Sequence, residues 1–479
     1  MSRTLTLWTV WLLATAAGAV ILAAGMVYGG SVRSNFAPGR MTSGHHQIEL
    51  ACTACHTSPF SGREAMQKAC IGCHGADLAT AKDSHPAKKF NDPRNADRLA
   101  KLKATECVTC HTEHRPEITR ATGLTLPADY CALCHQDIGR ERPSHVGLDS
   151  ATCLNSGCHN YHDNRALYED FLEKHAREPD LKSPAVMKLR ATSVPPTGTA
   201  KPITSIAAAD APPSHRGDAH VGADWLASAH AKGGVNCAGC HAPKAKTPEA
   251  IATGWIAKPD HQACTSCHEQ EGRGFVQGRH GMRLAAGMKV STPDPTGLVK
   301  ASKLGPMQPS LARLPMAREA HAANLTCTSC HQAHAFATRD GEVKACLGCH
   351  ADEHSKRYIG SPHHKAWLAE VAGKAPAGSG VTCAGCHMPR IAREDPDTGE
   401  DRVFADHNQN NTLRPASKMI RPVCMSCHGL GFAIDALADR RLVESNFAGR
   451  PSARVESITW VMRRLKEGEG KSNAKDTSK

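Results

Sequence analysis

The longest hydrophobic run of the chain lies close to its N-terminus. Residues 7–28 form 22 consecutive uncharged positions, and about 20 apolar residues suffice for one helix to cross a bilayer. The apolar part of a cleaved secretory signal is shorter, about 7–15 residues. We therefore expect residues 1–30 to be an uncleaved membrane anchor. Small residues at 14–16 and 23–25 leave a cleaved signal peptide as the alternative.

The rest of the chain shows only short stretches of regular polar and apolar alternation. A helical pattern covers residues 165–176, whereas residues 190–215 are rich in Pro, Ala and Thr and predict a linker. Residues 281–320 contain five prolines and predict a loop or connector. Residues 467–479 are mostly small and charged and predict a disordered tail. The pattern predicts a mainly α fold with extensive loops.

Composition adds that side chains alone would not fill the interior. The 479 residues include only 20 Phe, Trp and Tyr, which is few for a core of this size. A hydrophobic content of 40% nevertheless argues against a wholly disordered chain. The mean hydropathy of −0.40 and the single long apolar run exclude a polytopic transporter.

All 22 cysteines fall into eleven copies of one local motif. Ten copies read C-x-x-C-H, the attachment signal for haem c, and the copy Cys153 to His159 reads C-x₄-C-H. Two thioethers hold one porphyrin, and the histidine after the second cysteine faces the iron. Zinc sites would not need a histidine directly after each pair, and a disulfide scaffold would need none. The cysteine pairs and proximal histidines are Cys52, Cys55, His56; Cys70, Cys73, His74; Cys107, Cys110, His111; Cys131, Cys134, His135; Cys153, Cys158, His159; Cys237, Cys240, His241; Cys264, Cys267, His268; Cys327, Cys330, His331; Cys346, Cys349, His350; Cys383, Cys386, His387; and Cys424, Cys427, His428.

The remaining histidines are numerous enough to give each iron a sixth ligand. Of 29 histidines, 11 are in the motifs and 18 are not. The 13 methionines could also ligate, but histidine is abundant enough to serve alone. Six further histidines are weaker candidates: His45, His175, His215, His220, His261 and His364. We expect the distal ligands among His46, His85, His114, His145, His162, His230, His280, His321, His334, His354, His363 and His407.

The motif also changes the meaning of the charge. The formal net charge is +12, which by itself suggests nucleic acid or a membrane surface as a partner. Haem propionates would offset this excess, so we interpret the basic residues as their counter-charge. We expect no nucleic-acid partner.

Motif positions divide the chain into two haem-bearing parts. Five motifs lie in a first domain, residues 31–189, and six in a second, residues 216–466, with the linker 190–215 between them. In the first domain, neighbouring motifs start 18, 37, 24 and 22 residues apart. Such spacing is too short to wrap a separate fold around each haem, so we expect the haems to pack close together.

Each part resembles a known group of cytochromes. In the second, Cys346-Leu-Gly-Cys349-His350 is followed by His354, then by Ser361-Pro-His363-His364 with Trp367, and later by Cys383-Ala-Gly-Cys386-His387-Met388-Pro389-Arg390. This succession resembles the later part of the hydroxylamine oxidoreductase family of octahaem cytochromes and, more distantly, the pentahaem nitrite reductases. The first part, with one anchor helix, five motifs and intervening histidines, resembles small bis-His multihaem cytochromes, including the membrane-anchored pentahaem subunits of quinol-oxidising complexes.

The octahaem resemblance implies a mostly helical fold around a rigid haem array. It implies long helices near the C-terminus, of which residues 440–466 would be a remnant. It also implies that the haem of His268 occupies the position of the family's active-site haem. Matched by order, the distal ligands would be His230, His334, His354, His363 or His364, and His407.

Three departures argue against the family's catalysis. Hydroxylamine oxidation uses a tyrosine from near the C-terminus, and no tyrosine follows Tyr358. The nitrite reductases often have lysine in place of a motif histidine, whereas all eleven motifs here have histidine. Arg279 and His280 follow the haem of His268 closely, and His280 could fill its sixth position.

Two functions remain open from the sequence. The first is an electron carrier, with eleven closely packed haems linking a quinol-linked membrane donor to a periplasmic acceptor. Because haem c is attached outside the cytoplasmic membrane, the haem domains would be periplasmic. The alternative is a reductase of nitrite, hydroxylamine or a sulfur oxyanion at the haem of His268, with Arg279 and His280 donating hydrogen bonds and His280 a candidate general acid. Redox proteins are the expected partners, and an oligomer remains possible.

Overall fold

The computed structural model divides the chain into two compact units. Unit 1 comprises residues 1–166 and 283–305, and unit 2 comprises residues 167–282 and 306–479. The structure describes residues 3–28, 38–58, 62–81, 85, 90, 93, 96–120, 123–141, 145, 150, 161–162, 169–191, 201–216, 218–285, 288–293, 299–335, 338–394, 399, 401–413, 416–452, 454, 458–459, 461–463 and 465–466. Three predicted haem-site residues, Cys153, Cys158 and His159, and the predicted tail 467–479 lie outside these ranges.

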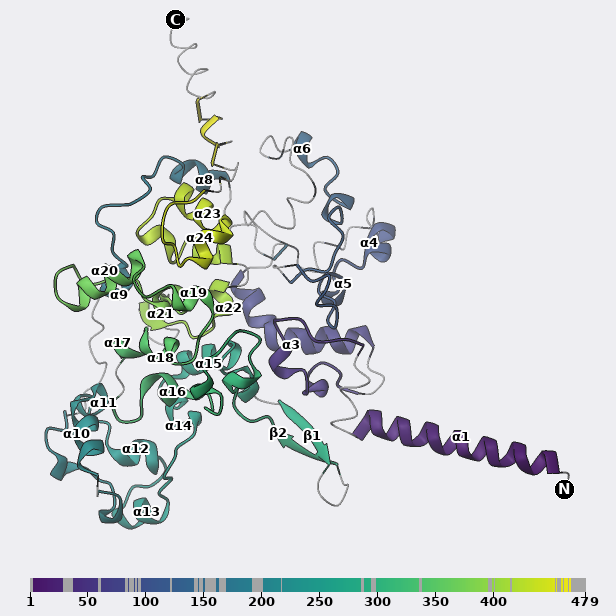
Figure 1. Ribbon diagram of the computed structural model, residues 1–479, viewed down its shortest axis with the longest axis horizontal. Helices are drawn as coiled ribbons and strands as arrows, with labels where there is room; N and C mark the ends of the chain where they lie inside the picture. The colour runs from purple at the N-terminus through teal and green to yellow at the C-terminus, as the bar shows by residue number, and fades with distance from the viewer. Residues whose placement is uncertain are drawn as a thin grey trace, which may run out of the picture. The chain divides into compact units, whose positions relative to one another are not determined.

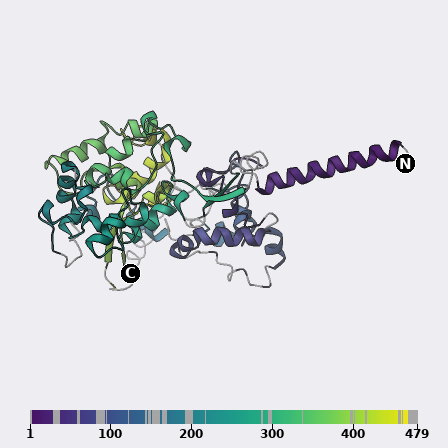
Figure 2. The same cartoon turned by 90° about the horizontal axis from the view of Figure 1, so that it is seen from below.

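Unit 1 begins with the long apolar helix predicted from the sequence. Helix α1 runs from Arg3 to Tyr28, and its span Thr4–Leu22 has a mean hydropathy of 1.9 with none of it buried (Figures 1 and 2). Among the described residues it is the one helix long and apolar enough to cross a membrane. A helix of this length at this position fits both an anchor and a signal sequence.

The rest of unit 1 is built from short helices around one longer helix. Helix α3 (Arg63–Ala81) carries the motif of His74 within its 19 residues and packs beside α5 (Cys107–Cys110). Gln67 in α3 accepts a hydrogen bond from the backbone of Cys107 at 2.8 Å and therefore ties two motifs together. The other helices of unit 1 are α4 (Ala96–Leu102) and α6 (Ile138–Glu141).

A β-hairpin also belongs to unit 1, although it lies far along the chain. Strands β1 (Lys289–Pro293) and β2 (Val299–Lys303) pair antiparallel, with Lys289 opposite Lys303. Arg283 at the hairpin's base donates to the backbone carbonyls of Gln47 and Gly305, both at 2.9 Å. The predicted loop or connector over 281–320 therefore contains strands. The prolines inside it did not reveal this pairing.

Unit 2 consists of short helices, long connections and a second hairpin (Figure 1). Strands β3 (Arg390–Glu394) and β4 (Asp401–Ala405) pair antiparallel. The helices are α8 (Glu169–His175), α9 (Lys188–Ala191), α10 (Ala219–Ala227), α11 (Ala229–Lys232), α12 (Cys237–His241), α13 (Pro248–Thr253), α14 (His261–Thr265), α15 (Glu269–Gln277), α16 (Cys327–His331), α17 (Thr338–Gly341), α18 (Lys344–Leu347), α19 (Glu353–Lys356), α20 (Pro362–Val371), α21 (Cys383–His387), α22 (Asn410–Leu413), α23 (Leu430–Ala438) and α24 (Arg440–Glu444).

The boundary between the units differs from the one expected at the Pro-rich segment. Residues 169–191 pack in unit 2, where Lys182 donates its backbone N–H to Cys427 and Met187 donates to Gly378. The described part of the predicted linker, residues 201–215, is packed too, because the Asp210 carboxylate accepts the backbone N–H of Ala238 at 2.9 Å. Composition indicated a linker, but backbone hydrogen bonds hold this segment against α11 and α12.

Small apolar clusters lie among the described residues of unit 2, and motif cysteines pack against two of them. Met187, Met419 and Val423 form one cluster, against which Cys386, Cys424 and Cys427 pack. Val343, Tyr358 and Trp367 form another, and Cys383 packs against it. Ala238, Ala242 and Ile251 form a third. Such small clusters fit the expectation that groups other than side chains complete the interior.

The C-terminal helices are shorter than the resemblance implied. Helix α24 ends at Glu444, and Asn446 and Phe447 follow with φ of 53° and 58°. Residues with positive φ cannot continue a right-handed helix. The expected remnant of a long helix over 440–466 is therefore interrupted after Glu444. The structure has a five-residue helix there instead.

Candidate functional site

Each described attachment motif forms a helical turn, which for the motif of His74 is part of the longer helix α3. The backbone N–H of the motif histidine donates to the carbonyl of the first cysteine, at 2.9 Å in both Cys107–His111 and Cys264–His268. Residues i, i+3 and i+4 of a helix share one face. Both sulfurs and the imidazole therefore lie on one side of the turn, as attachment and ligation of a single porphyrin require.

Local caps hold several of these turns. The Asn236 side chain accepts the backbone N–H of Cys237, and the Thr382 hydroxyl accepts that of Gly385, each at 2.9 Å. Side chains that accept the first free N–H groups of a helix typically stabilise it by about 1 kcal/mol. Thr382 is almost completely buried, with 1% of its surface exposed. Its hydroxyl therefore has a fixed partner inside the protein.

Nine motif histidines each face a second histidine from outside the motifs. Two imidazoles on opposite sides of one metal ion, each with its nitrogen about 2.0 Å away, have ring centres about 6 Å apart. The observed distances between ring centroids range from 5.8 to 6.4 Å, so the pairs fit an iron between them. The pairs, motif histidine first, are His74 with His45, His111 with His162, His135 with His85, His241 with His334, His268 with His230, His331 with His407, His350 with His280, His387 with His354, and His428 with His363.

Hydrogen bonds fix which nitrogen of these rings is available. In His85 and His241, Nδ1 lies 2.7 Å from a backbone carbonyl, that of Tyr161 and of Ile256. A carbonyl cannot donate, so Nδ1 carries the proton and Nε2 keeps the lone pair that a metal would use. The same arrangement holds for His111, His354, His407 and His428.

The surroundings keep these rings neutral. Burial, together with a smaller effect of neighbouring histidines, lowers the pKa of His280, His363 and His387 to about 4. A histidine must be neutral to bind a metal. These three rings are therefore in their ligating form at neutral pH.

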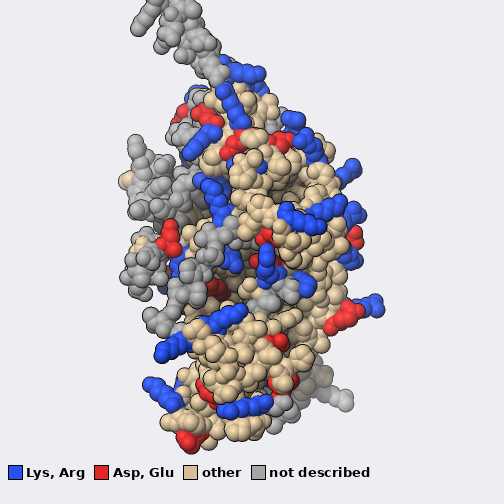
Figure 3. Space-filling model, turned by 90° about the vertical axis from the view of Figure 1, so that its left-hand side faces the viewer, with Lys and Arg blue, Asp and Glu red and all other residues tan. Residues whose placement is uncertain are grey.

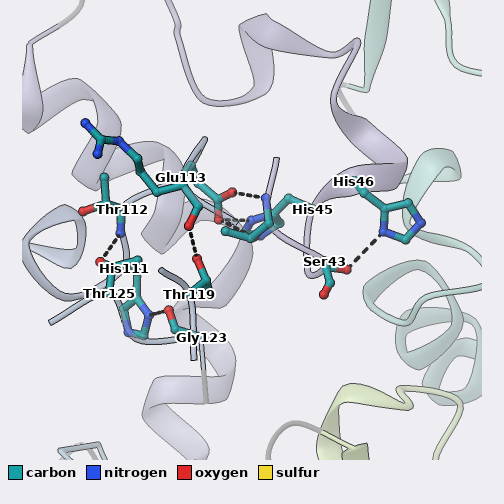
Figure 4. A network of polar contacts seen from close by, with 11 residues as sticks. Ser43, His45, His46, His111, Thr112, Glu113, Thr119, Gly123 and Thr125 are labelled. Carbon is teal, nitrogen blue, oxygen red and sulfur yellow. Dashed lines mark hydrogen bonds and ion pairs between the residues drawn. The ribbon is translucent and has the colours of Figure 1, made fainter. Parts of the chain in front are cut away.

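One pair differs from the others in its hydrogen-bond partner (Figure 4). The Nδ1 of His45 lies 2.7 Å from Oε1 of Glu113, which also accepts from the Thr42 hydroxyl at 2.9 Å. The Thr42 backbone N–H donates to Oε2 at 3.0 Å. Burial raises the pKa of Glu113, but the bonds from His45 and Thr42 outweigh it and lower that pKa to about 2. Glu113 is therefore a fixed negative charge.

Interactions between cysteines of different motifs indicate which motifs are neighbours in space. A hydrogen bond to the neighbouring thiol is the main cause that raises the pKa of Cys70, Cys264 and Cys346. In the other pairs burial raises the pKa of the first cysteine most, and the neighbouring thiol adds to it. Hydrogen bonds between thiols join Cys70 with Cys107, Cys264 with Cys327, and Cys346 with Cys383; electrostatic interactions relate Cys55 to Cys73, Cys110 to Cys131, Cys240 to Cys264, and Cys330 to Cys346.

Every one of these interactions joins two motifs that are consecutive along the chain. The last two motifs of unit 2 also share one apolar cluster, which includes Cys386, Cys424 and Cys427. Within each unit, the described motifs therefore follow one another in space in their order along the chain. The sequence alone did not give this order.

The three residues of the suspected catalytic site do not come together. His268 faces His230, whereas His280 faces His350, so the expectation that His280 could fill the sixth position at His268 is wrong. Helix α15 separates them, because its nine residues carry the chain about 13 Å along the helix axis. The backbone N–H of Arg279 donates to the Gln409 side chain at 2.9 Å.

The structure places most of the predicted distal ligands opposite a motif histidine, but not all of them. Eight of them lie opposite a motif histidine: His85, His162, His230, His280, His334, His354, His363 and His407. The ring opposite His74 is that of His45, whereas the expected set of distal ligands contains its neighbour His46. No signal within the sequence separates these adjacent residues, because the contact with Glu113 is made 68 positions away.

Four candidates are not placed opposite a motif histidine among the described residues: His46, His114, His145 and His321. His114 and His46 nevertheless direct Nδ1 to backbone carbonyls, those of Gly39 at 2.9 Å and Ser43 at 3.1 Å. His56 is exposed in unit 1, and within the described part of the chain no ring faces it in the way seen for the other motifs. The role of His114 and His46 as distal ligands stays a prediction.

Basic side chains are spread over the face of unit 2 seen in Figure 3. On this face Lys and Arg lie from one end to the other instead of gathering in a single patch. Some are already paired within the protein, as Arg339 is with the buried Glu370 at 2.8 Å.

Together, the motif turns and the facing imidazoles define a multihaem c-type cytochrome, mostly helices and loops, a class whose role is electron transfer. Residues 44–136 match the model of the cytochrome c3 family, so this part of the chain contains a cytochrome c3 domain. No curated protein and no solved structure matches the chain. The resemblance of residues 215–440 to octahaem cytochromes stays a prediction.

Proposed function

We propose that the chain is an electron carrier with eleven covalently bound haem c groups. They would form a sequential relay within each unit. Haem supplies one-electron chemistry by cycling its iron between the ferric and ferrous states. The chain's own residues anchor each porphyrin through two cysteines and fill both axial positions with histidine. The observation that carries the proposal is the set of nine facing imidazole pairs at 5.8–6.4 Å.

The histidine pairs suit electron transfer better than catalysis. Imidazoles held by hydrogen bonds at Nδ1 cannot turn away from the iron, so little rearranges when an electron arrives. Filling both axial positions also leaves no position for a substrate. The reductase alternative needs an open position at His268, and His230 lies opposite that ring. We therefore do not propose it.

Spin state tests this proposal. Electron paramagnetic resonance of the purified oxidised protein should show low-spin haem only, unchanged by cyanide or nitrite. Quantitation of haem per chain should give eleven. A high-spin fraction of about one haem per chain that shifts on adding nitrite would overturn the carrier proposal in favour of a reductase.

We further propose that α1 anchors the protein and that a quinol-linked membrane enzyme donates electrons to it. A periplasmic redox protein would accept them. The support is the exposed apolar helix Thr4–Leu22 together with haem c attachment outside the cytoplasmic membrane. N-terminal sequencing of the protein from washed membranes tests the anchor. A sequence starting near Met1 supports it, and one starting beyond the apolar run shows that the helix is a cleaved signal.

A further inference from the structure

Glu113 connects two haem sites that are distinct along the chain. It stands two residues after His111 of one motif, yet its carboxylate meets His45, which faces His74 of the preceding motif. Both partners are half-buried, with 31% of the His45 side chain and 28% of the Glu113 side chain exposed. At these exposures water screens their interaction only in part.

Thr42 also holds the Glu113 carboxylate in place. Thr42 donates its backbone N–H to one oxygen and its hydroxyl to the other, at 3.0 and 2.9 Å. The oxygen that receives the hydroxyl also receives Nδ1 of His45. Figure 4 shows the Glu113 carboxylate between these groups. Glu113 is therefore aimed at the distal imidazole and does not simply lie near it.

Where the structure gives the Nδ1 partner of another facing histidine at hydrogen-bond distance, that partner is a backbone carbonyl. The Nδ1 atoms of His85, His354 and His407 point to neutral backbone carbonyls. Asp352 comes within 3.8 Å of Nδ1 of His350, which is beyond hydrogen-bond distance. An ionised acceptor makes a hydrogen bond roughly twice as strong as a neutral one.

We propose that Glu113 lowers the reduction potential of the haem held between His45 and His74, relative to haems whose histidines bond to carbonyls. A carboxylate at Nδ1 makes the imidazole a stronger donor at Nε2, and added electron density with a nearby negative charge favours ferric over ferrous iron. Glu113 is thus a tuning residue that acts through His45. This inference rests on the proposed histidine ligation.

The substitution Glu113→Gln tests the proposal because it removes the charge and keeps nearly the same shape. In a spectroscopic redox titration of the whole haem-loaded protein, one component should move to a more positive potential while the others stay. Glu117→Gln is the matched control, since Glu117 is an exposed carboxylate four residues later in the same unit. It should leave every component in place. Equal titrations for wild type and Glu113→Gln would overturn the proposal.

Thr42→Val supplies a second test with the opposite sign. Without the Thr42 hydroxyl, Oε1 of Glu113 has one hydrogen-bond donor fewer. The hydrogen bond between this oxygen and His45 should therefore strengthen. The redox component that moves in Glu113→Gln should then move to a more negative potential. General damage to the fold would not shift one component in opposite directions in the two variants. A shift of the same sign in both would contradict the tuning role.

His45→Ala separates this inference from the proposed function. It should abolish one low-spin resonance, and the component lost should be the one that moves in Glu113→Gln. If His45→Ala changes no resonance, the histidine ligation is wrong. If a resonance disappears but Glu113→Gln leaves that component unmoved, the ligation stands and the tuning role fails.

Discussion

The imidazole of His230 lies opposite that of His268, with ring centroids 6.0 Å apart and planes at 80°. His230 is carried by α11, whose N-terminus is capped by Ser228. The ring opposite His268 is therefore fixed by a capped helical turn. Of all the motif histidines, His268 is the one whose haem the octahaem resemblance connects with catalysis, so the occupant of this position decides between carrier and reductase.

Replacing His230 should open this site. In His230→Ala we expect one haem to become high-spin and to bind cyanide, while the wild type binds none. His280→Ala should act at a different haem, that of His350, because the His280 ring lies 6.2 Å from it. Paramagnetic resonance with a cyanide titration measures both variants. Loss of the same resonance in both would show that the two histidines serve one iron.

Removing a motif in the middle of unit 2 should break its relay. Cys346 interacts electrostatically with Cys330 of the preceding motif and by a hydrogen bond with Cys383 of the following one, so the double substitution Cys346→Ala and Cys349→Ala would delete an internal haem. Stopped-flow reduction of the remaining haems should then split into a fast and a slow phase. The matched control is Cys424→Ala with Cys427→Ala, which deletes the last motif and should keep one dominant phase. Equal kinetics in the two variants would contradict the sequential order.

The Glu178 carboxylate should make unit 2 sensitive to acid. Burial raises its pKa, but bonds from His175 and Lys182 outweigh burial and lower it. A group that binds its proton less tightly when folded contributes stability above its unfolded pKa, about 4.3, and this contribution is lost as pH falls through the lower folded value. Glu178→Gln should therefore lower the apparent Tm at pH 7, and the difference from wild type should narrow below about pH 4.

Thermal unfolding followed by circular dichroism between pH 3 and 8 measures this effect. Glu319→Gln is a suitable control, because Glu319 is exposed in the same unit. It should change the apparent Tm little at any pH. A Tm difference for Glu178→Gln that stays constant down to pH 3 would show that the carboxylate's charge is not responsible.

Packing at the start of α23 offers a test of the core. Leu430 is fully buried, with 0% of its surface exposed, whereas Leu368 on α20 is 47% exposed. Leu430→Ala should cost about 2–5 kcal/mol of unfolding free energy, and Leu368→Ala about 0.5 kcal/mol or less. Denaturant unfolding of the haem-loaded protein compares them. Similar costs would mean that α23 does not pack as described.

The motifs were predictable from the sequence because their geometry is local. Spacing of i, i+3 and i+4 sets the two sulfurs and the imidazole on one face of a turn, whatever surrounds it. The partners were not predictable in the same way. His280 is 12 positions from His268 and 70 from His350, yet it faces the more distant ring. Contacts between distant parts of the chain decide which ring His280 faces. The periodicity of the sequence gives no information about these contacts.

The domain boundary was likewise not predictable from the local sequence. The proline content near residue 190 suggested a linker, but Pro and Ala composition does not report which backbone groups find partners. The backbone N–H of Gly429 donates to Pro179, and Nδ1 of His428 lies 2.8 Å from the carbonyl of Asp180. These bonds assign residues 169–191 to unit 2. A hairpin at 289–303 crosses the boundary in the other direction.

The positions of the facing histidines along the chain determine the order in which the haem sites would gain their second histidine during export. In a chain exported N-terminus first, His45, His85 and His230 emerge before the motifs they face, so these sites have both ligands as soon as the motif arrives. His111, His241 and His331 must wait for His162, His334 and His407. With the proposed ligation, each such iron would until then have an open coordination position while neighbouring sites would already be complete. A stalled or truncated chain would accumulate high-spin, ligand-binding haem at these three sites first.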